Sequence, residues 1–177
     1  MIRFLLLVFL TPSLMATEQA FPPSPVGSAE LKTLPAGVLL KATAAGNYFE
    51  QSSRLFRPLF DYISVRDIAM TTPVEAQIDG AAMYFWVAKS QRHKITGNSA
   101  GVEMLEVPER RVASLGARGS YSPENFIKTR DDLVAWLATR KDVKPAGPPY
   151  AVYWNGPFLP GFMKRFEVHV PVQAVAR

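Results

Sequence analysis

The chain has 177 residues, of which 48% are apolar, so it has room for one ordinary domain or for two small halves that share a core. It contains no cysteine, which excludes disulfides, thiolate metal sites, thiol nucleophiles and a lipoprotein anchor. The formal net charge of +5 favours anionic ligands or surfaces, but the basic residues are scattered, so the pattern argues against nucleic-acid binding.

The first sixteen residues have the composition of an export signal. Arg3 supplies a short positive region, an apolar run follows at 4–10, and small and polar residues lead to Ala16. The apolar run is too short to cross a bilayer, which takes about 20 residues, so no integral membrane anchor is expected. We predict a signal peptide over 1–16, with Ala20 as the alternative cleavage position, and a periplasmic or secreted protein.

A proline-rich segment follows the signal peptide. It contains the sequence FPPSPVG at 21–27, whose prolines cannot sustain a helix or a paired strand. We therefore predict a tether over residues 17–28.

The remainder, 29–177, is predicted to be one domain built from two pseudo-repeats, about 29–90 and 102–172. Leu34-Pro35 recurs as Val107-Pro108, 107 − 34 = 73 positions later. The expected elements of the first unit are a strand-like opening at 31–43, a helix at 48–63, and strands at 68–78 and 83–90. Those of the second unit are an opening at 102–116, a helix at 123–140, and strands at 150–155 and 165–172. Such a duplication of strand-strand-helix-strand-strand units predicts an α+β fold, a distorted and mostly antiparallel β-barrel with two helices.

The two helices differ in how well the sequence specifies them. Ser122 can cap the second helix, and Pro123 suits its first helical position. The first helix contains Pro58, which removes a backbone donor, so we expect a kink or an early break there. Each helix has one apolar face, which by default packs in the core.

A catalytic interpretation has little support, and we predict a protein that is not an enzyme. The chain has only two histidines and no nucleophile elbow, phosphate-binding glycine loop or metal-ligand spacing. His93 lies in a polar connection, where a solvated side chain is expected. His169 is a weak candidate metal ligand on the last predicted strand.

Glu167 lies on the same side of that strand as His169. The opposite side carries Phe166, Val168 and Val170, and this pattern suggests that the apolar side faces the interior. If the Glu167 side faces a pocket instead, the buried carboxylate needs a partner such as Arg165, a tyrosine or a cationic ligand.

The stretch WNGPFLPGFMKRF, residues 154–166, combines aromatic residues, prolines and glycines with Lys164 and Arg165. An amphiphilic ligand with an apolar body and carboxylate arms would suit this set. An ordinary hairpin loop with a basic tip explains it equally well.

Two segments resemble the SOUL heme-binding family. LFDYISVRDIAMTTPV (59–74) resembles the family's first helix, the loop after it and a Met-Thr-x-Pro-Val strand, and YAVYWNGPFLPGFMKRFEVHVPV (150–172) resembles its closing loop and last strand. Between them, the second opening strand and helix fall where the family's second half begins, so the resemblance covers residues 29–172 in order.

The resemblance implies a duplicated barrel with two helices, related in shape to gyrase-inhibitory-like ligand-binding domains, and non-catalytic binding of heme or another tetrapyrrole. In the family the tetrapyrrole is thought to lie against the first helix and neighbouring loops. Carried over by position, the implied ligand-binding residues are Arg54, Leu55, Leu59, Tyr62, Met70, Met163, Lys164 and Arg165. The axial histidine proposed for some members falls here at Lys32-Thr33-Leu34, so histidine ligation of the iron is not expected.

Two functions therefore stay open. The leading one is a periplasmic binder of heme or porphyrin that uses an apolar groove with basic groups at its edge. The alternative is a binder of other lipophilic or cationic small molecules through the carboxylate of Glu167, without heme.

Overall fold

The computed structural model describes residues 17–156 and 158–175, and the predicted signal peptide at 1–16 lies outside them. Nine strands form one sheet in which every neighbouring pair is antiparallel, in the order β1-β6-β9-β8-β3-β4-β2-β5, with β7 paired to β9. The strands are β1 (Ala29–Leu34), β2 (Gly37–Thr43), β3 (Val74–Gln77), β4 (Ala82–Val87), β5 (Glu103–Val107), β6 (Arg110–Arg118), β7 (Val143–Pro145), β8 (Tyr150–Tyr153) and β9 (Arg165–Ala174).

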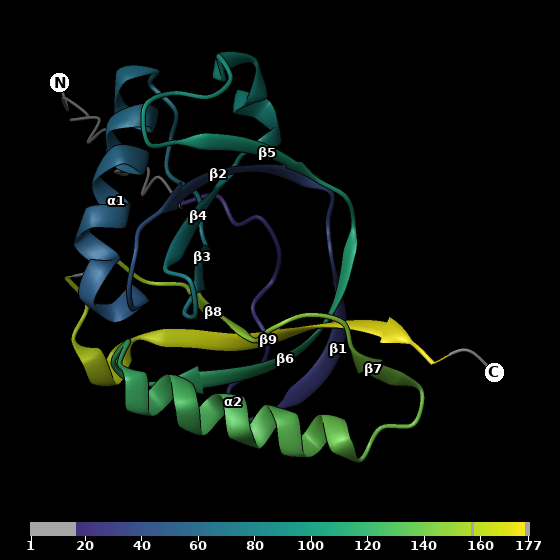
Figure 1. Ribbon diagram of the computed structural model, residues 1–177. Coiled ribbons are helices and arrows are strands. Elements are labelled where there is room, and N and C mark those ends of the chain that lie inside the picture. The colour runs from purple at the N-terminus through teal and green to yellow at the C-terminus, as the bar shows by residue number, and fades with distance from the viewer. Residues whose placement is uncertain (1–16, 157, 176–177) are drawn as a thin grey trace, which may run out of the picture.

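The sheet curls into a half-barrel, and both long helices lie on its outer side (Figure 1). Helix α1 (Tyr48–Val65) packs on β2 and β4, and helix α2 (Pro123–Ala138) packs on β6 and β9. Short 3-10 helices follow β4 and precede β9, at η1 (Lys89–Lys94) and η2 (Gly161–Met163). The predicted α+β fold, with its mostly antiparallel sheet and two helices, is confirmed.

Helix α1 does not break at Pro58 but continues to Val65, contrary to the expected early break. Its buried face, including Leu55 and Leu59, belongs to the main core between the helices and the sheet. Burial of a leucine side chain contributes about 1.5–3 kcal/mol, comparable to the roughly 3 kcal/mol that an interior proline costs, so packing on the sheet holds the helix together.

A second apolar cluster lies on the inner side of the half-barrel. It comprises Phe21, Leu34, Leu39, Trp86, Val112, Tyr150, Val152 and Trp154. The segment 17–28, expected as a tether, runs through this interior as the purple trace in Figure 1 and inserts two buried side chains, Phe21 and Ser24. The sheet is therefore covered on both faces, by helices outside and by this segment inside.

Candidate functional site

The amino-terminal ends of the two helices approach each other (Figure 1). The residues at these ends line a cleft of about 370 Å³. Its volume falls in the range of small-molecule pockets, about 300–1,000 Å³. The cleft is walled mainly by aromatic residues from α1, from the start of α2 and from β8, and its lining comprises Tyr48, Phe49, Ser52, Tyr121, Ser122, Pro123 and Tyr153.

Two of the tyrosines of this cleft, Tyr121 and Tyr153, differ in the hydrogen bonding of their hydroxyls. The Tyr121 hydroxyl donates to the Arg165 carbonyl at 3.0 Å and accepts from the Asn155 amide at 2.9 Å. The Tyr153 ring stacks on Tyr121 with centroids 4.1 Å apart, yet its buried hydroxyl has no hydrogen-bond partner among the described residues. An orphaned buried hydroxyl costs free energy, so this atom is a ready donor for a ligand.

The phenols of the cleft stay protonated at neutral pH. Burial raises the pKa of Tyr121 to about 12, although hydrogen bonds to the backbone oppose the effect. Burial, together with the neighbouring tyrosines, raises the pKa of Tyr48 and of Tyr153 still further. The cleft therefore offers phenolic O–H groups, rather than phenolates, to a ligand.

Positive groups border the cleft, although each helix also carries a carboxylate in its first turn, Glu50 in α1 and Glu124 in α2. The amino-terminal ends of α1 and α2 both lie at it, where the helix dipoles place partial positive charge. The Lys164 ammonium lies 4.9 Å from the centroid of the Tyr121 ring. A ligand with an apolar body and carboxylates at its edge matches this combination.

The structure separates the residues implied by the resemblance. Leu55, Leu59 and Tyr62 are buried in the core beneath α1, and the Tyr62 hydroxyl donates to the Gly97 carbonyl at 2.7 Å. Arg54 is exposed on α1, and Met70 is half-buried against the core. The side chain of Lys164 reaches the wall of the cleft, and Met163 precedes it with 47% of its surface exposed.

Glu167 lies on the inner face of the sheet, away from the cleft, and is fully buried. Its carboxylate accepts hydrogen bonds of 2.7–2.9 Å from the Ser24 amide, the Lys32 ammonium, the Ser114 hydroxyl, the Trp154 indole and the His169 imidazole. The strand pattern suggested that only the Phe166 side faces the interior, whereas both sides are buried because the segment 17–28 covers the second one.

Burial alone would raise the pKa of Glu167, but the hydrogen bond from His169, together with the hydrogen bond and positive charge of Lys32, lowers it to about 2. Burial lowers the pKa of His169 below its usual value of 6.5, so its neutral ring donates from Nε2 to Glu167. Nδ1 then accepts from the Tyr150 hydroxyl, 3.3 Å away. Both ring nitrogens of the weak metal candidate His169 are therefore engaged by protein groups.

Across residues 17–156 and 158–175, no three His, Cys, Asp or Glu side chains gather in a way that would hold a metal ion. Within the same residues, no helix has the length and apolar character needed to cross a membrane. His93 lies exposed in η1, in agreement with the solvated position expected for it.

A comparison with known protein families shows which family the chain belongs to. The model of the SOUL heme-binding protein family matches residues 22–171. The chain belongs to this family. Membership supports a heme- or tetrapyrrole-binding role in general. No curated protein matches the sequence.

Solved structures share the fold of this SOUL domain at low sequence identity. The EcmrR C-terminal domain is 14% identical with a TM-score of 0.65, and the match covers 84% of this chain and 98% of that one. EcmrR in its DNA complex is 13% identical with a TM-score of 0.67, and the match spans 84% of this chain but only 58% of the EcmrR chain. A protein described as a hydrolase from Listeria innocua is 12% identical with a TM-score of 0.58, over 85% of this chain and 94% of that chain. These likenesses show the fold alone.

Sequence reasoning missed the tyrosines of the cleft. One signal points to two of them: Tyr121 follows Tyr48 by 121 − 48 = 73 positions, the spacing that also separates Leu34 from Val107. The two tyrosines lie near the starts of the two helices but not at the same helix position, since Tyr48 follows the N-cap Asn47 of α1 and Tyr121 precedes the N-cap Ser122 of α2. Nothing in the sequence marks Tyr153, because only its position in β8 turns the ring toward the helices.

Proposed function

We propose that this SOUL protein binds heme or another tetrapyrrole in the tyrosine-walled cleft, without catalysing a reaction, after export to the periplasm. The observation that carries the proposal is the orphaned hydroxyl of Tyr153 in an aromatic cleft bordered by Lys164. The export signal predicted from residues 1–16 supports the periplasmic location.

The residues present fit a tetrapyrrole. Tyr48, Phe49 and Tyr121 offer aromatic faces to an apolar macrocycle, whereas the Lys164 ammonium suits a propionate. Heme would bring a redox-active iron to the site. The cleft lining contains no histidine or methionine, and its tyrosines stay protonated, so apolar burial and propionate pairing supply the affinity.

The alternative, a cationic ligand at Glu167, is less well supported. Lys32 already lies 2.9 Å from that carboxylate, and four further groups donate to it. A ligand cation would have to displace Lys32 and leave its ammonium without a carboxylate partner.

The test is a pair of absorbance titrations, with hemin and with metal-free protoporphyrin. We expect the two affinities to agree within about tenfold, a difference of about 1.4 kcal/mol. Lys164→Ala should weaken both by about two- to fivefold, as expected for a partly exposed charge pair worth up to about 1 kcal/mol. Tyr153→Phe should weaken both by about two- to twelvefold, the equivalent of one hydrogen bond.

Lys144→Ala, which removes an exposed lysine of β7, is the matched control and should change neither affinity. Strong hemin binding with no detectable protoporphyrin binding would show that an iron ligand dominates. Affinities that neither Lys164→Ala nor Tyr153→Phe alters would place the tetrapyrrole outside this cleft.

A further inference from the structure

The segment 19–26 occupies the interior of the half-barrel in the way a ligand would. The Phe21 ring lies between two tryptophans, with centroid distances of 5.7 Å to Trp86 and 5.5 Å to Trp154, and both contacts are edge-to-face. The His169 ring centroid lies 6.0 Å away, and the Lys32 ammonium lies 5.1 Å from the Phe21 centroid. This aromatic cage holds one ring, which the segment supplies.

Three oxygen atoms of the segment accept hydrogen bonds from two cations, whereas the Ser24 amide donates to Glu167 at 2.7 Å. The Lys32 ammonium donates to the Pro22 carbonyl at 3.2 Å and to the Ser24 hydroxyl at 2.9 Å. The Arg165 guanidinium donates to the Ser24 carbonyl through one terminal nitrogen, while its buried Nε has no acceptor in the described part of the chain. The segment therefore satisfies the guanidinium incompletely, and a carboxylate would satisfy it better.

The charges around the cage favour an anion over a cation. Glu167 is neutralised by Lys32, and Glu75 by Arg110 at 2.7 Å. The Arg165 guanidinium has no carboxylate partner among the described residues. A ligand that replaces the segment must fill the ring site and supply oxygen acceptors to Lys32 and Arg165.

A few residues, rather than strand pairing, keep the segment 19–26 in place. Only Phe21 and Ser24 are buried, and no residue between 19 and 26 lies in a strand of the sheet. Single β-bridges fix the two ends, from Gln19 to Thr72 and from Val26 to Gly116. Opening the segment therefore breaks the buried hydrogen bonds of Ser24 to Glu167 and Ser114 and the two bridges, but no strand pairing of the sheet.

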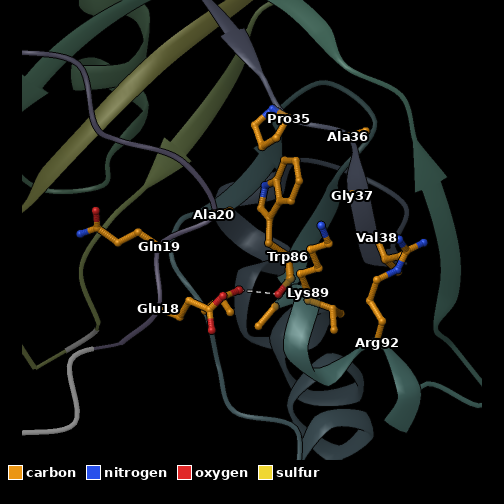
Figure 2. Close-up of a pocket in the computed structure, with 13 residues that line it drawn as sticks. Glu18, Gln19, Ala20, Pro35, Ala36, Gly37, Val38, Trp86, Lys89 and Arg92 are labelled. Atoms are coloured by element: carbon orange, nitrogen blue, oxygen red, sulfur yellow. Dashed lines mark hydrogen bonds between the residues drawn. The ribbon is translucent and has the colours of Figure 1, made fainter.

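An open pocket adjoins the cage at Trp86. It has a volume of about 420 Å³, and the segment residues Glu18 to Ala20 form one side of it. Figure 2 shows the Trp86 indole beside Ala20, with Lys89 and Arg92 on the opposite side of the pocket. Because Trp86 borders both this pocket and Phe21, a ligand in the pocket already touches the wall of the cage.

We propose that the interior of the half-barrel is a second ligand site, for small aromatic carboxylates, and that residues 19–26 fill it as a displaceable internal ligand. The ring of the carboxylate takes the place of Phe21, and its oxygens take the place of the Pro22 and Ser24 oxygens as acceptors for Lys32 and Arg165. This site lies on the opposite face of the sheet from the tyrosine cleft and does not depend on tetrapyrrole binding.

Two variants vacate the site by different means. Phe21→Ala removes the ring from the cage. Gly116→Ala places a Cβ 2.5 Å from the Pro25 carbonyl oxygen and 2.7 Å from that of Ser24, so the segment must move. Phe158→Ala is the control, because it removes a phenylalanine ring that is 98% exposed.

The probes are phenylacetate, phenylacetamide and 2-phenylethylammonium, titrated into the full chain and its variants by calorimetry. We expect Phe21→Ala to bind phenylacetate at least tenfold more tightly than the wild type does, and at least tenfold more tightly than it binds the ammonium compound. Adding Lys32→Met to Phe21→Ala should reduce this preference at least fivefold. In the wild type, saturating phenylacetate should increase amide hydrogen exchange in residues 19–26.

A preference for 2-phenylethylammonium, or equal binding of all three probes, would overturn the assignment of ligand class. If Phe21→Ala and Gly116→Ala keep the circular dichroism spectrum of the wild type but neither gains affinity for phenylacetate, the interior is not a ligand site. The same gain in Phe158→Ala would show non-specific binding and would also overturn the proposal. Hemin titrations of the same variants should be unchanged, which separates this test from that of the tyrosine cleft.

Discussion

Replacing Glu167 by glutamine tests the interior network most directly. The carboxylate is fully buried, and its pKa is lowered from 4.5 to about 2 in the folded protein. One pKa unit corresponds to about 1.4 kcal/mol, so this shift represents about 3 kcal/mol of stability at pH 7. We expect Glu167→Gln to lower the free energy of unfolding by about that amount, because Lys32 loses its counter-charge.

The pH dependence of this loss gives the sharper test. A carboxylate whose pKa is depressed by folding stabilises the protein above its unfolded pKa, and the contribution disappears as the pH falls toward the folded pKa. The difference between wild type and Glu167→Gln should therefore stay constant above about pH 5 and shrink between about pH 4.5 and pH 2.

Urea unfolding followed by tryptophan fluorescence at pH 7, 5 and 3.5 measures this difference. Glu103→Gln is the matched control, since Glu103 forms an exposed pair with Lys41 and should contribute less than about 1 kcal/mol. An equal loss for Glu167→Gln at pH 7 and pH 3.5, or a loss at pH 7 no larger than that of the control, would refute the assignment of the stability to this charge.

Three further measurements test the ionisation of His169, the export signal and the role of His93. Burial lowers the pKa of His169, so the unfolded chain takes up a proton on this imidazole more readily than the folded protein does. The free energy of unfolding should therefore decrease as the pH falls below about 6.5, and this decrease should be absent in His169→Gln. The same decrease in His169→Gln would contradict the assignment to His169. The mature protein should begin near Thr17 and occur in the periplasmic fraction, and an intact mass that includes Met1 would contradict the predicted signal peptide. His93→Ala should leave thermal stability and hemin affinity nearly unchanged, since the side chain is exposed in η1, and a large loss of hemin affinity would make His93 an iron ligand.

The sequence specified the helices and the sheet well where local signals agree. Ser122 caps α2 and Pro123 begins it, as predicted from residue type alone. The end of α2 at Ala138, two residues before the predicted Arg140, is a typical boundary difference. The early break expected at Pro58 does not occur, because packing on the sheet, which a local pattern does not contain, keeps α1 continuous. The short strand β7 was not anticipated, since three residues carry no usable periodicity.

The candidate site was less predictable than the fold. Alternation along β9 gives the two sides of the strand but not what covers each side. The cover on the Glu167 side is a proline-rich segment without helical or strand period, so nothing in its pattern indicates a place inside the half-barrel. The resemblance likewise identified the first helix as a ligand wall, but its buried face packs against the sheet, and only the first turns, at Tyr48, Phe49 and Ser52, line the cleft.

Arg165 contacts both proposed sites, so the choice of variant decides whether the two sites can be tested separately. Its guanidinium donates to Ser24 on the inner side of the sheet, whereas its backbone carbonyl accepts from Tyr121, a wall of the cleft on the outer side. The neighbours Tyr153 and Trp154 turn to opposite faces in the same way, one to the cleft and one to the Phe21 cage. A joint change of Lys164 and Arg165 would therefore weaken propionate pairing and also loosen the internal segment. Lys164→Ala alone acts only on the cleft, so a loss of tetrapyrrole affinity in that variant can be assigned to one site.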